Sequence, residues 1–422
     1  MGMLRTTVAL IAVLAAACGA RTSSTSPASY AAGDRAVAHD RPCTFPAKVH
    51  GPLRIATMRC RPSDGFGWHE MAVDPAGGAV LAAYGGSNLP EEHTKMFLVR
   101  VDHRLGQTWS QVVDRVEVPM GITASSGRMA LLTNATYEGR MLFRAFDSAS
   151  APPAPSRTIQ LEKDYIAFGL AEDAAGRLYT RVGDTHDYAV FDATGARIGG
   201  GSLAVAGTEP RPWSFLAASE PVTTRVVRSG SGRIAFAENL APASGAPARL
   251  NIVFVDPGGS PPSAVTLQDG FHTEASELGT HVDGVVVASR EVGIQPTREN
   301  LYPIPGRLSI ALVSERGVAW TKMLDVPADR MHVAADARGF ITLVATFEDH
   351  VVIGTDRVAA KRGAFIARLD PRGNLLGWVT IDDDDGKLAN VHAKAVVVAP
   401  DGRAFIAGSA YENLWIATID PP

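Results

Sequence analysis

The stretch that decides the fold is residues 365–422, where the chain reads FIARLDPRGNLLGWVTI over 365–381, AVVVAPDGRAFIAGS over 395–409 and LWIATIDPP over 414–422. Each piece is a short apolar run that ends in a turn built from Asp, Pro or Gly. Such runs are typical of strands that are joined by hairpin turns. The sequence therefore predicts a series of short antiparallel strands in this region.

The same unit recurs toward the N-terminus as far as about residue 70. Its first half is two apolar runs joined by a glycine turn, and these turns lie roughly 50 residues apart, at Gly77, Gly127, Gly176, Gly232, Gly284, Gly339 and Gly402. Its second half is an alternating run that ends in Asp or a substitute, and the copies begin at Phe97, Met141, Tyr188, Asn251, Leu308, Phe365 and Leu414.

Four short strands in each unit, with no helical periodicity, predict an all-β fold. We expect a seven-bladed β-propeller with four antiparallel strands per blade over residues 51–422. A large β-sandwich is one alternative. A six-bladed propeller is the other, because the copy over residues 120–160 is degenerate and rich in proline.

The seventh copy stops after its third strand, and an unassigned strand at residues 53–60 precedes the first copy. An open ring would leave sheet edges and blade faces exposed. We therefore expect residues 53–60 to complete the last blade as its outer strand, beside residues 414–420.

Two parts of the chain, residues 365–419 and the copy at 71–113, resemble the bacterial β-propeller repeat of exported and surface proteins, which is a seven-bladed, SBBP-like type. This resemblance implies the fold and an exported setting. The repeat class has no catalytic residues in common, so the resemblance implies no reaction.

The N-terminus has the pattern of an export signal over residues 1–17. Arg5 precedes the apolar run 8–17, which is too short to span a membrane and ends in small residues. Cys18 follows directly, which resembles a bacterial lipoprotein signal and implies that Cys18 carries the lipid. Gly19 then favours the outer membrane or cell surface of the envelope. An ordinary signal peptide cleaved nearby is the alternative.

Residues 18–50 are rich in Ala, Ser and Pro, which predicts a flexible tether between the lipidated cysteine and the propeller. Of the three cysteines, Cys43 and Cys60 remain after Cys18. An exported protein lies in an oxidising compartment, so we expect these two to form a disulfide. Two free thiols are the alternative.

The net charge of −4 and the absence of a basic block make nucleic acid and anionic membrane surfaces poor partners. We expect a monomer that is attached to the membrane through its lipid and that binds a protein or a carbohydrate. The sequence indicates no cofactor.

Candidate ligand-binding residues lie where the chain enters the inner strands of blades 5, 6, 7 and 1. They are His69, Glu70, His272, Glu274, His332, His392 and Lys394. These blades are consecutive in the ring, so the side chains would gather on one arc of the channel mouth. Neutral imidazoles bind transition metals and act as general bases near neutral pH. Separately hydrogen-bonded residues lining a wet channel are the alternative, and we assign no metal ligands and no catalytic residues.

No metalloprotease, nucleophile-elbow or phosphate-loop motif is present in the sequence. The run Asp382–Asp385 has the spacing of no calcium loop, and we expect it to be a solvated loop. The leading hypothesis is therefore a binding or scaffold module at the cell envelope. The alternative is a propeller enzyme, a lyase or hydrolase that uses the histidine-rich channel mouth.

Overall fold

The computed structural model divides the chain into two compact units, Met1–Val37 and Ala38–Pro422. All described residues belong to the second unit. They are 41–42, 47–62, 69–75, 77–85, 95–113, 118–125, 128–135, 140–147, 157–161, 167–182, 186–204, 226–240, 249–267, 276–290, 306–382, 391–410 and 413–422. Every regular element among them is a β-strand.

Four sheets each contain four antiparallel strands in chain order, and we number them as blades 1 to 4. Blade 1 has β4 (His69–Asp74), β5 (Gly78–Gly85), β6 (Lys95–Val101) and β7 (Gln107–Val113). Blade 2 has β8 (Val118–Ser125), β9 (Arg128–Ala135), β10 (Arg140–Asp147) and β11 (Arg157–Gln160). Blade 3 has β12 (Ala167–Glu172), β13 (Leu178–Val182), β14 (Asp187–Phe191) and β15 (Arg197–Ser202). Blade 4 has β16 (Val226–Arg228), β17 (Ile234–Leu240), β18 (Arg249–Val255) and β19 (Ser263–Leu267).

Blades 5 and 6 share one eight-stranded sheet, because a single long strand is the outer strand of one blade and the inner strand of the next. Blade 5 has β20 (Ser276–His281), β21 (Gly284–Arg290), β22 (Gly306–Ser314) and the first half of β23 (Gly317–Ala335). Blade 6 has the second half of β23, then β24 (Ile341–Ile353), β25 (Asp356–Leu369), β26 (Leu375–Ile381) and β2 (Ala47–His50). Blade 7 has β27 (Val391–Val398), β28 (Ala404–Ala410), β29 (Asn413–Ile419), β3 (Ile55–Pro62) and β1 (Arg41–Pro42).

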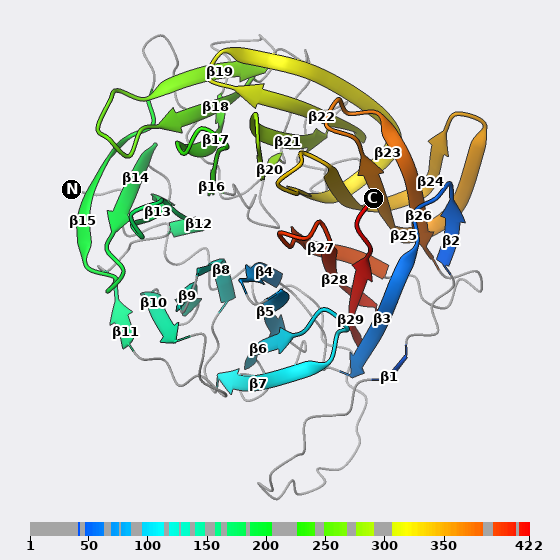
Figure 1. Ribbon diagram of the computed structural model, residues 1–422, viewed down its shortest axis with the longest axis horizontal. Coiled ribbons are helices and arrows are strands. Elements are labelled where there is room, and N and C mark those ends of the chain that lie inside the picture. The colour runs from blue at the N-terminus through cyan, green and yellow to red at the C-terminus, as the bar shows by residue number, and fades with distance from the viewer. Residues whose placement is uncertain are drawn as a thin grey trace, which may run out of the picture. The chain divides into compact units, whose positions relative to one another are not determined.

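The sheets surround a common axis, with the first strand of each blade innermost (Figure 1). Around the axis, each inner strand contacts the next in the order β4, β8, β12, β16, β20, β23, β27 and then β4 again. The described residues thus contain seven inner strands in a closed ring. The fold is a β-propeller, and this ring is consistent with seven blades.

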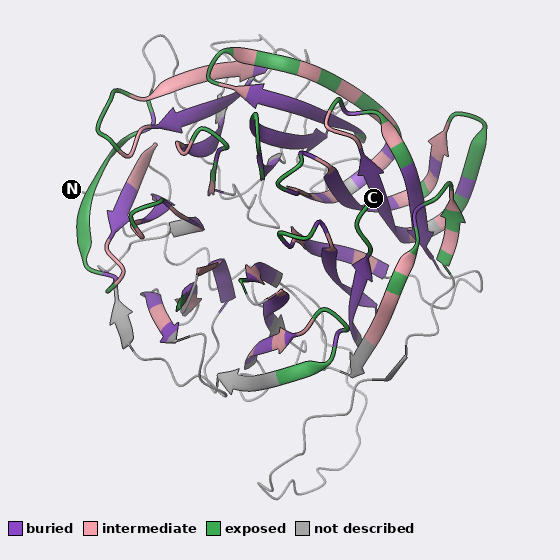
Figure 2. Cartoon of the chain, in the orientation of Figure 1, coloured by how far each residue is buried: buried purple, intermediate pink, exposed green. Residues whose placement is uncertain are grey.

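Hydrophobic packing explains why the blades stay together. The core consists of clusters that each join two neighbouring blades, and the cluster between blades 7 and 1 closes the ring. In β5, Leu81 packs toward blade 7, whereas Val80 and Ala82 pack toward blade 2. Successive side chains of a strand point to opposite faces, so a blade buried on both faces needs the continuous apolar runs seen in the sequence. The outer strand β15 is exposed throughout (Figure 2).

The predicted closure of the last blade is confirmed. β3 pairs antiparallel with β29, with Cys60 opposite Trp415 and Met58 opposite Ala417. Because β29 is the third strand of blade 7, β3 completes the blade from the N-terminal side of the chain.

Two short strands depart from the four-strand plan. Residues 47–50, which we placed in the tether, form β2 and add a fifth strand to blade 6 beside β26. Residues 41–42 form β1 and pair with residues 59–60 of β3 in blade 7. Two parts of the predicted tether are therefore paired into the sheets.

The run Asp382–Asp385 is only partly described. Asp382 is buried and accepts a hydrogen bond from Lys48 Nζ at 3.4 Å. The prediction of a solvated loop was therefore wrong for Asp382, because the added strand β2 covers it. Asp383, Asp384 and Asp385 lie outside the described residues.

Candidate functional site

The ring has two ends, which we call the top face and the bottom face. Inner strands begin at the top face and end at the bottom face. The bottom face carries the Asp-Gly turns of the repeat, as in the turn after β23. There Asp336 Oδ1 accepts hydrogen bonds from the amides of Arg338 and Phe340, both at 2.9 Å. Gly339 adopts a φ of 84°, a conformation that favours glycine.

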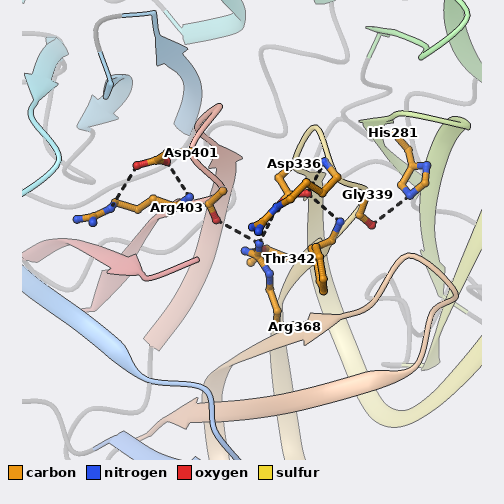
Figure 3. A network of polar contacts seen from close by, with 10 residues as sticks. His281, Asp336, Gly339, Thr342, Arg368, Asp401 and Arg403 are labelled. Carbon is orange, nitrogen blue, oxygen red and sulfur yellow. Dashed lines mark hydrogen bonds and ion pairs between the residues drawn. The ribbon is translucent and has the colours of Figure 1, made fainter. Parts of the chain in front are cut away.

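Polar side chains on the bottom face cross-link neighbouring blades (Figure 3). Buried Arg368 in blade 6 donates to Asp336 Oδ2 at 3.2 Å, to Thr342 Oγ1 at 2.7 Å and, across to blade 7, to Gly402 O at 3.1 Å. His281 Nε2 of blade 5 lies 3.1 Å from Gly339 O of blade 6. These hydrogen bonds therefore stabilise the contacts of blade 6 with blades 5 and 7.

The top face has a different set of charged side chains on the inner strands, which we call the top-face cluster. Its members are Glu70 on β4, Glu277 on β20, Arg330 and His332 on β23, and His392 and Lys394 on β27. Glu70, Glu277 and Lys394 are buried. Because β20, β23, β27 and β4 are consecutive in the ring, these residues lie on one arc around the axis.

The best-defined contact of the cluster joins His332 and Glu277. His332 Nδ1 lies 3.5 Å from Glu277 Oε1, and the exposed fractions of the side chains are 12% and 3%. A carboxylate beside an imidazole orients the ring and stabilises its protonated form. The pair is therefore able to hold a proton or a polar ligand group at this end of the ring.

In blades 2 and 3, the described residues with which the inner strands begin are uncharged. There the chain reads VPM at 118–120 and AFG at 167–169, whereas in blade 4 the described strand begins at Val226, directly after Arg225, which lies outside the described residues. The structure places Val118 and Met120 in the core between blades 2 and 3, and Val226 in the core between blades 3 and 4. Among the described inner-strand residues, the top-face charge is therefore confined to the arc of blades 5, 6, 7 and 1.

Blades 3 and 4 carry a separate polar network on their second strands. Arg181 Nε donates to Glu238 Oε1 at 2.6 Å, and His186 Nδ1 lies 2.7 Å from Glu238 Oε2. Burial alone would raise the pKa of Glu238. The hydrogen bond with His186 and the charge of Arg181 outweigh it, so the pKa of Glu238 is lowered. This network joins two blades at their top ends.

The structure places the predicted site residues as follows. His332 and His392 lie on neighbouring inner strands, and Lys394 lies two residues beyond His392. Glu70 is on β4, and His69 is the first residue of that strand. His272 and Glu274 lie outside the described residues, so their part of the prediction stays a prediction.

Sequence reasoning missed Glu277, which pairs with His332, and passed over Arg330. Both signals were visible in the sequence. Glu277 directly precedes the buried Leu278 in the inner strand β20, and Arg330 lies two residues before His332, on the same side of the strand. A charged residue in a strand that is buried on both faces is unusual.

Two further features concern metal binding and membrane spans in the described part of the chain. Within it, no group of three or more His, Cys, Asp and Glu side chains is arranged to hold a metal ion. Over the same residues there is no helix of the length and apolar character that a membrane span needs.

No protein-family model matches the sequence, and no curated protein matches it. Solved structures are similar. A streptogramin B lyase has a TM-score of 0.50 and 10% identity, covering 89% of this chain and 98% of that one. BBS1N, solved in complex with ARL6DN, has the same TM-score, identity and coverage. A virginiamycin B lyase from Staphylococcus aureus has a TM-score of 0.49 and 12% identity, covering 86% and 99% of the two chains. At such identities the likeness shows the β-propeller fold alone.

Proposed function

We propose that the protein is an exported, lipid-anchored binding or scaffold module of the bacterial cell envelope. Its ligand, a protein or a carbohydrate, binds at the top face over blades 5, 6, 7 and 1. The protein acts as a monomer at the outer membrane or cell surface. The observation that carries this proposal is the one-sided charge of the inner strands, with Glu277, His332 and Lys394 on one arc.

The free-energy cost of burying charged side chains supports a functional role for these residues. Removing a charged group from water costs several kcal/mol, and even a well-paired buried ion pair is often no more stable than apolar packing. Blades 2 and 3 have uncharged described residues at the start of the same strands, such as Val118 and Met120 of blade 2. The fold therefore does not require charge at these positions. Buried charged groups of this kind are typical of binding and catalytic sites.

The binding test is a pull-down from solubilised envelopes with the full chain as bait. The double substitution of His332 and His392 to Ala should lose the captured ligand. The matched control is the double substitution of His103 and His350 to Ala, which removes two histidines outside the cluster and should retain the ligand. Equal capture by both variants would rule out the top face as the site.

The anchor is tested separately. Metabolic labelling with a palmitate analogue should label the wild-type protein and the Cys60→Ser variant, and both should fractionate with membranes. The Cys18→Ser variant should take up no label. An unlabelled wild-type protein would contradict the lipid anchor and leave the binding proposal unaffected.

An enzyme is the second candidate, and the contact between His332 and Glu277 favours it. An imidazole held by a buried carboxylate is an arrangement used for general acid–base catalysis. Incubation of the captured ligand with fresh protein, followed by mass spectrometry, distinguishes the two functions. A ligand of changed mass with wild type, and unchanged mass with Glu277→Gln, indicates a lyase or hydrolase. An unchanged mass with both indicates a binding module.

A further inference from the structure

His186 lies at the top ends of blades 3 and 4 and is not part of the top-face cluster. It directly precedes β14 in blade 3. Its carbonyl accepts hydrogen bonds from the Leu203 amide at 2.5 Å and from the Ser202 hydroxyl at 3.2 Å. These bonds tie the start of β14 to the end of the outer strand β15. The main chain at His186 is therefore fixed by two strands of its own blade.

The side chain of His186 is oriented by Glu238 of blade 4. Nδ1 of His186 lies 2.7 Å from Glu238 Oε2, and only 3% of the Glu238 side chain is exposed. Burial opposes ionisation of Glu238, but the contacts with His186 and Arg181 outweigh it and lower the pKa of this carboxyl. Glu238 is therefore ionised at neutral pH, and an ionised carboxylate only accepts hydrogen bonds. It follows that Nδ1 of His186 carries the proton of this contact.

The repeat does not require a carboxylate at the position of Glu238. Glu238 is the sixth residue after the turn glycine Gly232, and the residue at this place is uncharged in five other blades, namely Ala83, Thr133, Val182, Ala345 and Gly408. In blade 5 the turn glycine itself begins the second strand, and Ser289, two residues beyond Val287, takes the same face toward blade 4. Since a buried ion pair is often no more stable than apolar packing, Glu238 points to a role beyond joining the blades.

The geometry leaves the other ring nitrogen of His186 to a ligand. A neutral imidazole whose Nδ1 donates a hydrogen bond has its lone pair on Nε2. No residue in the described part of the chain forms a hydrogen bond with Nε2, and 12% of the side chain is exposed. The charge of Glu238 is matched by Arg181, whose Nε donates to it at 2.6 Å. A lone pair beside a balanced ion pair suits a neutral hydrogen-bond donor, such as a hydroxyl group.

We propose that His186 is the hydrogen-bond acceptor of a second ligand site on the top face, over blades 3 and 4, which takes a hydroxyl group of a sugar. Glu238 is a positioning residue that holds the ring and fixes its tautomer. This inference goes beyond the proposed function, because it involves no residue of the top-face cluster.

The binding test titrates glucose, galactose, mannose and N-acetylglucosamine separately into the full chain and follows each titration by calorimetry. At least one sugar should bind the wild type. His186→Phe should bind it about tenfold more weakly, because a phenyl ring leaves the sugar hydroxyl without an acceptor. The matched control is His350→Phe, which removes another imidazole beside a carboxylate, 2.8 Å from Asp349, and should bind as wild type does. The double substitution of His332 and His392 to Ala should also leave sugar binding unchanged.

Nitrogen-15 NMR of the histidine-labelled chain tests the tautomer, which a merely structural role of Glu238 would not control. The signals of His186, assigned by their loss in His186→Phe, should show the proton on Nδ1 in wild type. Glu238→Gln should move it to Nε2, since the glutamine amide is able to donate to Nδ1, and should weaken sugar binding as well. If His186→Phe does not fold, His186→Asn replaces it in both experiments, because its amide keeps a donor toward Glu238.

Four results would overturn the inference. They are no binding by any of the four sugars, equal binding by wild type and the His186 variant, loss of sugar binding in the His332 and His392 double variant alone, and an unchanged tautomer in Glu238→Gln. None of them decides the envelope pull-down, so the proposed function stands or fails separately.

Discussion

Arg368 joins three groups on the bottom face. Its guanidinium contacts Asp336, Thr342 and the carbonyl of Gly402, and only 2% of the side chain is exposed. Removal of one partner of a buried ion pair leaves the other charge uncompensated, which costs about 3–5 kcal/mol. We therefore expect Arg368→Met to lower the free energy of unfolding by about that amount in urea denaturation.

The control is Arg372→Met, which changes an exposed arginine four residues further along the chain. It should shift the free energy by less than about 0.5 kcal/mol. The double variant Arg368→Met/Asp336→Asn should recover part of the loss, because it also removes the stranded carboxylate. A loss of under 1 kcal/mol in Arg368→Met would show that the network contributes little.

The lowered pKa of Glu238 predicts how the free energy of unfolding depends on pH. Its pKa is lowered in the folded protein, so its ionised form stabilises the fold above the unfolded pKa of about 4.5, and this stability is lost as the pH falls through the folded pKa. The stability difference between wild type and Glu238→Gln should shrink as the pH falls below about 4.5. Urea denaturation at each pH measures it. A difference that grows on acidification would contradict the assigned direction.

At the scale of elements, the apolar repeat was predictable because middle strands such as β21 and β28 are buried on both faces, which favours apolar residues at every position. Strand β2 was not, because its four residues, AKVH, are a short run with only two apolar side chains, of which Val49 is exposed. Its stability comes from contacts made only in the fold. His50 stacks on Trp378 with ring centroids 3.7 Å apart, and Lys48 reaches Asp382. The long strand β23 was missed likewise, since it belongs to two repeats.

The candidate site was partly predictable for the same physical reason. His332 and His392 stood out because imidazoles are rare in apolar strands, and the repeat fixed which blades are neighbours. The partner of His332 could not be read from the sequence, because Glu277 lies 55 residues away and comes close only through ring packing.

The pairing of β1 with β3 bears on the predicted disulfide between Cys43 and Cys60. β1 places Arg41 opposite Cys60, which brings the chain just before Cys43 beside β3, while Cys43 itself lies outside the described residues. We expect peptide mapping of the non-reduced protein to find Cys43 linked to Cys60. Cys43→Ser should then lower the free energy of unfolding by about 2–4 kcal/mol. Alkylation of both thiols in the native, unreduced protein would disprove the bond.

At the scale of the whole propeller unit, stability depends on closing the ring. Blade 7 takes its fourth strand from β3, and Leu53, just before β3, packs into the cluster between blades 6 and 7. Without β3, the edge of β29 loses its partner, and the apolar cluster that contains Ala417 and Ile419 loses the cover of Ile55 and Met58. This closing strand joins the two ends of the propeller unit, so its effect should extend beyond one blade.

We therefore expect deletion of residues 1–62 to lower the Tm by roughly 5–10 °C, which corresponds to a few kcal/mol in a domain of this size. A synthetic peptide of residues 51–62, added in excess, should restore part of the Tm, because it supplies the missing strand in trans. The matched control is the same peptide with Met58→Pro, since proline interrupts strand pairing. Deletion of residues 1–37 alone, which removes none of the described strands, should leave the Tm unchanged. An unchanged Tm after deletion to residue 62 would mean that the ring is held by its interblade cores without a closing strand.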